Sequence, residues 1–548
     1  MATVISRRIQ QGKDETVVTP DIVAGNLSDS KESVPTISAV GLNLGAPADE
    51  KKFWWQRRRD YNPDAIATLP SVFDDPETAK TLSASWTWRE EYAVLRKVDV
   101  RIMIFACVMF MALELDGANL TQAVTDNFLG DLEMNTNDYN WGNTVFKLSF
   151  LCAELPSQLV SKWMGPRSLD SYTNGSLVYR RSFTVLAMIL YLSYFYKHGE
   201  LSLRLGFWWT AMSIADIVAS FLGFGLLHLR GHLGYAGWRW LFLVEDTVLT
   251  PSWGLFTLIP CLVTFILMPP RPCQTANWAR GKKGWFTERE ETIMVNRIIR
   301  EDPSKISMHN RQPITPKLLW QSLSDYDLWP LYLLGLNFQT PMTTPTQYLT
   351  LSLKQLGFDT FKTNLLVIPS QVGHIITMLL FTYLAEVVGQ LWLFGLLAQL
   401  WALPFLAYIY AIDINSIDKW VAFGVMTVPL SYPSVHAIQV GWNSRNSNSV
   451  RSRTVSAALY NMACRSSGII ASNIYREDDR PRYRRGNRAL VSICAMNVGL
   501  YIFAKAYYAL RNRYRDKVWN SMTEDQRAEY LATTTDKGNK RLDFRFAS

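Results

Sequence analysis

Charged and amide side chains interrupt two long apolar segments in the first half of the chain, where they could bind an ion or carry a proton. The segment MFMALELDGANL contains Asp116 and Asn119, three residues apart and therefore on one helix face. A second segment contains Lys147 and Glu154, seven residues apart and again on one face. A charge inside hydrocarbon costs several kcal/mol unless it faces a cavity or a partner. Both pairs indicate either contact with a substrate or proton, or ion pairs that hold helices together.

The second half offers a polar segment, LGLNFQTPMTTPTQYL, which contains Asn337 and Gln347. Pro341 and Pro345 should kink a helix here and free backbone carbonyls. This pattern predicts the lining of a cavity. The alternative is that the same side chains hydrogen-bond to neighbouring helices.

A third candidate is the group Tyr432, His436 and Gln439, whose intervals of four and three residues would form one polar stripe on a helix. We expect this stripe to be the C-terminal contribution to a site. His374 and His436 could relay a proton, because histidine titrates near neutrality. A lone histidine inside a span more often hydrogen-bonds one helix to another, and this alternative stays open.

These residues lie in segments that are long enough to cross a bilayer. Of the 548 residues, 48% are hydrophobic and 13% aromatic, whereas polar ends and one polar middle stretch bring the mean hydropathy to zero. About eleven apolar segments approach the roughly 17 to 25 residues that span a bilayer. The sequence therefore predicts an all-α, polytopic membrane protein. The expected spans are 100–120, 139–160, 183–196, 205–227, 238–268, 328–353, 364–385, 391–412, 420–440, 454–475 and 489–510.

Polar stretches divide the chain into five parts. They are a cytosolic, mostly disordered N-terminal tail (1–97), an N-terminal helical bundle (98–268), a central cytosolic loop (269–327), a C-terminal six-helix bundle (328–510) and a cytosolic C-terminal tail (511–548). In the central loop, Thr287 and Glu290 form a capping box ahead of an amphipathic helix. Two bundles around one basic loop match the plan in which a substrate binds between two halves near the midplane.

Other functions are disfavoured by the motifs that the sequence lacks. It has no G-x-S-x-G, no H-E-x-x-H and no dinucleotide-binding fingerprint after a strand. Its six Cys show no C-x-x-C spacing, so we expect no metal, disulfide framework or cofactor. The formal charge of +9 is spread over tails and loops, which is typical of topology signals and not of a nucleic-acid surface. We therefore expect neither an enzyme nor a nucleic-acid-binding protein.

Several stretches resemble one family. They read KVDVRIMIFACVMFMALELDGANL, NDYNWGNTVFKLSFLCAELPSQLVSKWMGPR, YLSYFYKHGELSLRLGFWWTAMSIAD, GWRWLFLVE, GWNSRNSNSVRSRTVSAALYNM and SGIIASNIYREDDRPRYRRGN. On these residues the chain is similar to the fungal allantoate permease-like family of the major facilitator superfamily, the anion:cation symporters. The resemblance implies a two-bundle fold with twelve spans, of which about eleven are apparent here.

The resemblance also implies a function, which is proton-coupled uptake of a small organic anion such as allantoate, nicotinate, pantothenate or biotin by a secondary active transporter. The protein would lie in the plasma membrane as a monomer, and its partners would be this anion, a proton and the lipid bilayer. The residues that we expect to face one another across a central cavity are Asp116, Asn119, Lys147, Glu154, Asn337, Gln347, Tyr432 and His436.

The chain departs from the family pattern in the interval before YLSYFYK. Residues 168–181 are too polar to cross a membrane, and the apolar remainder, 182–196, is about 15 residues long against the roughly 20 that are needed. We therefore predict that 168–181 forms no transmembrane helix and that one crossing is lost. This loss favours an alternative in which the protein is a non-transporting receptor or an inactive remnant, unless the gene carries a splice or frame error.

Three further features do not fit the family pattern. Gly117 stands where the family pattern D-R-x-N has Arg, and Arg465 lies inside the eleventh span. The loop 475–488 contains six Arg against three carboxylates, although the family topology places it outside and the positive-inside bias predicts few cations there.

Overall fold

The computed structural model describes residues 86–126, 128–164, 191–192, 195–240, 269, 275–277, 281, 284–301, 320, 323–413, 416–447, 450–480, 482–534 and 538–548. These residues form two units. The first combines the described residues up to Lys97 with those of 271–300, and the second contains the rest.

The first unit contains two helices, α3 (Trp88–Val98) and α12 (Glu288–Glu301). The amide of Thr287 donates to Glu290 Oε2 at 3.0 Å, and the amide of Glu290 donates to Thr287 Oγ1 at 3.3 Å, so the predicted capping box is confirmed. α3 lies inside the part predicted as an N-terminal tail. Two ion pairs join the helices, Lys97 with Glu290 at 2.5 Å and Arg289 with Glu90 at 2.6 Å. The hydrogen bond from Arg289 holds the pKa of Glu90 below its usual range.

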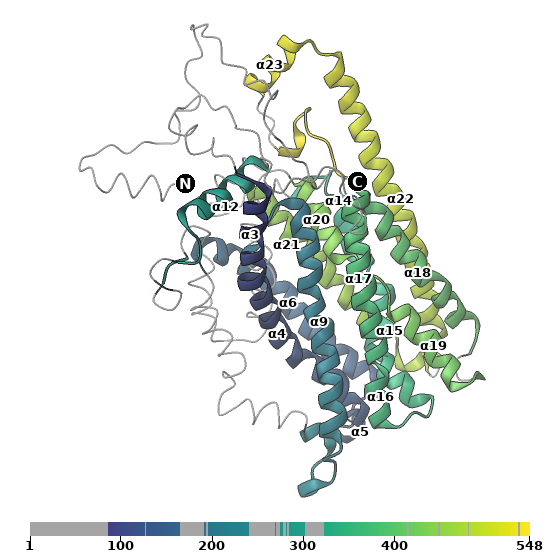
Figure 1. Cartoon of the computed structure of the whole chain (residues 1–548). Coiled ribbons are helices and arrows are strands. Elements are labelled where there is room, and N and C mark those ends of the chain that lie inside the picture. Colours follow the sequence, from purple (N-terminus) through teal and green to yellow (C-terminus); the bar gives the residue numbers. More distant parts are fainter. Residues whose placement is uncertain are drawn as a thin grey trace, which may run out of the picture. The chain divides into compact units, whose positions relative to one another are not determined.

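The second unit is a bundle of helices that run between two ends (Figure 1). The helices before the central loop are η1 (Asp99–Met103), α4 (Ile104–Ala123), η2 (Val124–Asp126), α5 (Phe128–Asp131), α6 (Thr136–Met164), α9 (His198–Leu227) and η3 (His232–Gly234). Those after it are α14 (Trp329–Asn337), α15 (Thr340–Gln355), α16 (Thr360–Leu366), α17 (Ile368–Val388), α18 (Leu391–Ala411), α19 (Lys419–Leu430), α20 (His436–Asn446), α21 (Val450–Ser472), η6 (Glu477–Asp479), α22 (Arg484–Ser521), α23 (Glu524–Thr533) and η7 (Gly538–Lys540).

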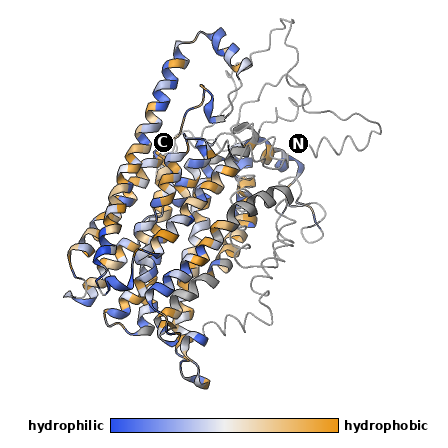
Figure 2. Cartoon of the chain, turned by 180° about the vertical axis from the view of Figure 1, so that it is seen from behind, coloured by the Kyte–Doolittle hydropathy of each residue, from blue (hydrophilic) through white to orange (hydrophobic). Residues whose placement is uncertain are grey.

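We name the ends of this bundle by the segments that they carry. The loop end carries residues 473–483, which connect α21 to α22, and the tail end carries residues 538–548 (Figure 1). Among the described residues, four stretches are long and apolar enough to cross a membrane: Glu200–Leu227, Lys362–Val388, Leu391–Ala411 and Arg484–Ser521. Apolar residues follow these helices, and hydrophilic residues gather in α23 and at the connections (Figure 2). The helical architecture confirms the predicted fold class.

The helix α9 packs against α4 on one side and against α17 and α20 on the other. On the α4 side, Trp208 stacks on Phe110 with a ring separation of 4.2 Å, and its indole N–H donates to the carbonyl of Ala106 at 3.2 Å. On the other side small residues allow close approach. A Cβ placed on Gly206 would lie 3.3 Å from Thr382 Cγ2, and one placed on Gly441 would overlap with Ser202 Oγ.

Breaks of more than one residue interrupt two of the expected long helices. The first break separates α14 from α15 near Pro341, and the carbonyls that it frees are used: Gln399 Nε2 donates to Phe338 O at 3.1 Å, and Asn497 Nδ2 donates to Asn337 O at 3.0 Å. The predicted kink is therefore confirmed. The second break, at residues 431–435 between α19 and α20, contradicts our expectation of one helix through 420–440. This stretch contains Pro433, which cannot donate a helical hydrogen bond.

The last described segment, 538–548, is bound to the tail end of the bundle. The indole N–H of Trp442 donates to Ala547 O at 2.7 Å, and Phe546 is buried. Lys540 Nζ lies 2.7 Å from the buried carboxylate of Asp327. Burial alone would raise the pKa of Asp327, but hydrogen bonds from Lys540 and Tyr507 outweigh it and hold the pKa below its usual range. Part of the predicted C-terminal tail is thus an ordered component of the bundle.

Some predictions fall outside the described residues. These are the absence of a helix at 168–181, most of the short span 183–196, and the span 238–268 beyond residue 240.

Candidate functional site

The N-terminal half of α6 presents a polar face to α21 and to the residues that follow it. Asn140, Thr144 and Lys147 are four and three residues apart and therefore share one face of α6. The amide of Asn140 donates to Tyr475 O at 2.8 Å, and Asn473 Nδ2 donates to Thr144 Oγ1 at 2.8 Å. We call this contact the polar seam. It joins helices that the sequence assigns to the two halves of the protein.

Lys147 forms the innermost contact of the polar seam. Its ammonium donates to Ser472 Oγ at 2.6 Å and to the carbonyl of Gly468 at 3.0 Å, both on α21. A Cβ placed on Gly468 would lie 3.4 Å from the Lys147 chain, so glycine leaves room for the lysine to reach the backbone. Both acceptors are neutral, and such contacts compensate a partly buried ammonium less completely than a carboxylate does.

Ser472 extends this contact to a third helix. Its hydroxyl donates to Gln347 Oε1 on α15 at 3.2 Å, so Lys147 and Gln347 are joined through one hydroxyl. The other end of this amide, Gln347 Nε2, is buried and has no hydrogen-bond partner among the described residues. A buried amide N–H is a donor that a ligand oxygen can satisfy.

His436 lies in an aromatic environment at the first turn of α20. Its ring centroid is 4.6 Å from that of Trp209 on α9, 5.7 Å from that of Tyr460 on α21 and 6.1 Å from that of Phe338. The hydroxyl of Tyr460 is 3.4 Å from His436 Nδ1 and donates to Gln439 Oε1 at 2.6 Å. His436 therefore lies where α9 meets the C-terminal helices.

Arg465 lies on α21 between residues of these two groups. It directly follows Cys464, whose Sγ is 3.9 Å from His436 Nδ1, and it lies one turn from Gly468, whose carbonyl binds Lys147. A lysine and an arginine close to one another favour binding of an anion, because an anionic ligand relieves their mutual repulsion. The feature that disagreed with the family pattern thus adds a cation beside the predicted residues. The sequence shows Arg465 as a charge inside a span, but it does not show which residues lie beside it.

The rim of the polar seam carries a carboxylate. Glu477 accepts a hydrogen bond from the amide of Thr136 at 3.3 Å, and it pairs with Arg480 at 2.8 Å. Burial alone would raise the pKa of Glu477, but the bonds from Thr136 and Arg480 outweigh it, so the pKa lies below its usual range. Other pairs, such as Arg485 with Asp478 at 2.5 Å, account for part of the arginine excess in this loop.

The remaining predicted residues lie elsewhere or outside the described side chains. Asn337 donates to Leu333 O of its own helix at 3.0 Å. Tyr432 precedes α20, and its carbonyl contacts His374 Nδ1 at 2.8 Å, so it does not continue the stripe of His436 and Gln439. The backbones of Asp116 and Asn119 lie in α4 and that of Glu154 lies in α6, but their side chains are outside the described set. The roles of all these residues stay predictions.

The described side chains favour binding over bond-breaking chemistry. Within the described ranges, no group of three His, Cys, Asp or Glu side chains is placed to hold a metal ion. The contacts provide a set of donors, from Lys147 and the Gln347 amide, and Arg465 lies one turn along α21 from the Gly468 carbonyl that Lys147 binds. Such a set can bind an anion with an oxygen-rich group.

Comparison with known proteins finds transporters that this chain resembles. The chain is 42% identical over 486 residues to the Saccharomyces cerevisiae protein described as uncharacterized transporter YIL166C. The matched region covers 84% of this chain and 88% of that protein. It is 24% identical over 488 residues to the major facilitator-type transporter hxnP of Emericella nidulans, covering 82% of this chain and 93% of that protein. No family model matches. A bacterial homologue of the iron transporter ferroportin aligns with a TM-score of 0.45 at 12% identity over 75% of this chain and 99% of the other, a likeness too weak for further argument.

Proposed function

Because the chain belongs to the major facilitator-type transporters of fungi, we propose that it takes up a small organic anion together with protons. The observation that supports an anion is Lys147, whose ammonium is bound only to neutral groups of α21 among its described contacts, one of them a turn away from Arg465 on that helix. A carboxylate ligand is a stronger partner for this ammonium than a carbonyl and a hydroxyl. The anion would be of the allantoate, nicotinate, pantothenate or biotin type.

The contacts of Lys147 suggest how an anion would act on the protein. In the polar seam the same ammonium that would bind the ligand also holds α6 to α21. A ligand that takes over these donors weakens the seam, so it binds better to a form in which the loop end is open. Such differential affinity is what shifts a two-state equilibrium. With the loop end outside, this form would accept substrate at the plasma membrane.

Coupling to protons requires a group that changes its charge in the membrane. We assign this role to Asp116 and Glu154, because intramembrane carboxylates serve as proton relays in transporters. Asn119, Gln347 and His436 would line the cavity, and Asn337 and Tyr432 would shape it through the backbone breaks beside them. We expect the carrier to work as a monomer.

Uptake measurements test this function. Labelled nicotinate, pantothenate, biotin and allantoate are offered to a yeast strain that lacks its own carriers for them, with and without a protonophore. We expect saturable uptake of at least one anion and its loss with the protonophore. Lys147→Gln should lower that uptake by about tenfold or more, which corresponds to one charge-assisted hydrogen bond. Lys362→Gln, which changes an exposed lysine on α16, is the matched control and should leave uptake unchanged.

Two outcomes would contradict the proposal. If no organic anion is taken up by a correctly localised protein, anion transport is wrong. If purified protein binds one of the anions but proteoliposomes never accumulate it, the protein is a receptor, which is the alternative that the polar interval 168–181 motivates.

A further inference from the structure

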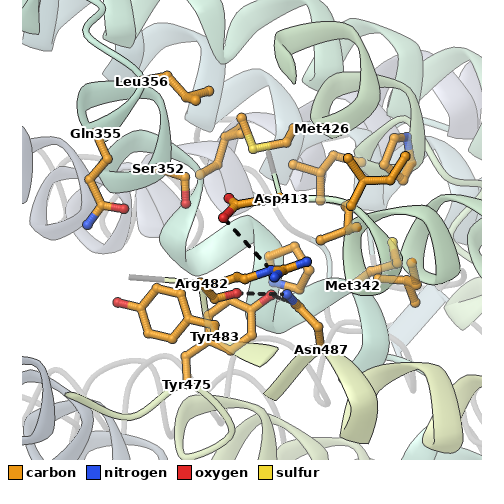
Figure 3. A pocket seen from close by; sticks show the side chains of 17 residues that line it. Met342, Ser352, Gln355, Leu356, Asp413, Met426, Tyr475, Arg482, Tyr483 and Asn487 are labelled. Atoms are coloured by element: carbon orange, nitrogen blue, oxygen red, sulfur yellow. Dashed lines mark hydrogen bonds and ion pairs between the residues drawn. The ribbon is translucent and has the colours of Figure 1, made fainter. Parts of the chain in front are cut away.

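A pocket opens within the C-terminal helices at the loop end, away from Lys147 and His436. Its volume is about 810 Å³, including space open to solvent. The walls come from α15, α18 and α19 and are apolar, with Met342, Leu406 and Met426 among them, and its rim is formed by the residues that lead into α22 (Figure 3). This combination of apolar walls and a few polar groups is the usual form of a small-molecule site.

Two opposite charges line this pocket close together. Arg482 Nε lies 4.0 Å from Asp413 Oδ2, which is too far for a hydrogen bond (Figure 3). Arg482 Nε is buried and has no hydrogen-bond partner among the described residues, although Arg482 Nη2 donates to Ala411 O at 3.3 Å. A buried guanidinium N–H that lacks a hydrogen-bond partner costs free energy, and a ligand acceptor such as a carboxylate recovers it.

The aromatic side of the pocket is held under strain. Tyr475 and Tyr483 stack with ring centroids 4.6 Å apart and planes inclined by 16°. Tyr483 has a φ of 46°, in the left-handed region that a bulky residue rarely adopts. Strained residues of this kind persist where their surroundings hold them, and they are common at ligand sites. The Tyr475 hydroxyl donates to Asn487 Oδ1 at 2.6 Å, which fixes its ring.

We propose that this pocket binds an apolar α-amino acid. The carboxylate of the ligand binds the guanidinium of Arg482, and its ammonium pairs with Asp413. Its apolar side chain lies between the methionines and the stacked tyrosines. The carboxylate of a simple carboxylic acid pairs with Arg482 but is repelled by Asp413. The ammonium of a simple amine pairs with Asp413 but is repelled by Arg482. Only a ligand with both groups complements the two charges at once.

Occupancy of the pocket acts on the polar seam through Tyr475. This residue lines the pocket with its ring, and its backbone carbonyl accepts the hydrogen bond from Asn140 of α6. Tyr348, which packs against Tyr475 and Tyr483, donates to Asn140 as well. A ligand that holds these rings in place therefore stabilises the closed loop end. The site does not depend on the proposed transport of an anion.

Equilibrium binding to the full-length protein in lipid nanodiscs tests the proposal. The probes are labelled L-phenylalanine, 3-phenylpropanoate, which lacks the ammonium, and phenethylamine, which lacks the carboxylate. We expect L-phenylalanine to bind at least about tenfold more tightly than either analogue. Arg482→Gln and Asp413→Asn should each weaken its binding by about tenfold, and Met426→Trp, which fills the pocket without changing its charge, should abolish it. Arg488→Gln, which changes an exposed arginine in the first turns of α22, is the control and should bind normally.

Other outcomes would overturn the proposal. Equal binding of 3-phenylpropanoate and L-phenylalanine would remove the role of Asp413. Loss of binding in Lys147→Gln with normal binding in Arg482→Gln would place the ligand at the polar seam instead. Hydrogen exchange gives an independent readout: L-phenylalanine should slow exchange in residues 136–147 of the wild type and leave Arg482→Gln unaffected, and no slowing in the wild type would disprove the link to Asn140.

Discussion

The helices α6 and α9 both reach across to the C-terminal half of the protein, but they do so with different chemistry. α6 uses the polar seam, whose contacts are hydrogen bonds from Asn140, Thr144 and Lys147. α9 meets α17 and α20 at glycines, where Gly206 faces Thr382 and Gly441 faces Ser202. We call this second contact the close seam. Hydrogen bonds can be exchanged for bonds to water or substrate at a net cost of about 0.5–1.5 kcal/mol each, whereas lost van der Waals packing has no such substitute.

The difference indicates which contact separates more readily. The donors and acceptors of the polar seam can each bond to water or to a ligand instead, so α6 can separate from α21 one hydrogen bond at a time. The close seam depends on the fit of backbone against side chain, and interiors of this kind tolerate little change of shape. We therefore expect the loop end to open at the polar seam while α9 stays packed against α17.

The largest effect should come from enlarging a residue of the close seam. In Gly206→Leu the new side chain meets Thr382, whose Cγ2 lies only 3.3 Å from the position that the new Cβ takes, so the helices must move apart. Overpacking of this kind costs about 1–3 kcal/mol. The measurement is the apparent melting temperature of purified protein, which should fall clearly. Gly225→Leu on the same helix is the control, because nothing lies within 4 Å of its Cβ position. Equal melting of the two variants would show that the close seam is not tightly packed.

A smaller effect should follow from removing the central hydrogen bonds of the polar seam. Asn140 is 3% exposed and bonds both Tyr475 O and the Tyr348 hydroxyl. Asn140→Ala leaves these two groups unpaired, at a cost of about 1–3 kcal/mol that water entering the seam will partly offset. We expect faster hydrogen exchange in residues 136–147 and little change in residues 198–210. Asn143→Ala is matched to it, since the Asn143 amide donates to the carbonyl of Tyr139 in its own helix. Similar exchange in both variants would contradict a special role for the seam.

The sequence predicted the parts of the fold that depend on neighbouring residues. The Thr287–Glu290 capping box starts α12 because both of its partners lie within one turn. The apolar segment predicted as 391–412 is α18 (Leu391–Ala411), and its apolar composition alone is enough to predict a helix there. The break at 431–435 is not predicted, because Pro433 stands inside an otherwise apolar segment whose helical periodicity continues across it.

The parts that depend on distant partners could not be predicted in this way. The spacing places Lys147 on one helix face with Glu154, but it does not show that its bonds go to Gly468 and Ser472, more than 300 residues further along the chain. Burial of Phe546 at the tail end requires Asn512, which bonds its backbone in both directions. Neither contact leaves a periodic signal. Local patterns therefore identified polar residues inside helices, but only the packing shows which helix each residue meets.

The smallest effect concerns pH, and it separates the two seams because only one of them contains a titrating group among the contacts named. Glu477 accepts from Thr136 at the rim of the polar seam, and its pKa is lowered from an ordinary value of 4.5. A carboxyl group with a lowered pKa stabilises the folded contact fully above its ordinary pKa, and this contribution disappears as the pH falls through the lowered value. Hydrogen exchange of residues 136–147, corrected for the intrinsic pH dependence of exchange, should therefore rise below about pH 4.5 relative to that of residues 198–210. Glu477→Gln should remove most of this pH dependence. Asp478→Asn alters a carboxylate of the same loop that bonds Arg485 and not α6, so it should preserve the dependence. The Glu477 side chain is 38% exposed, so screening by solvent should keep the change small. A profile that is equally steep in both seams would show that this carboxylate does not stabilise the polar seam.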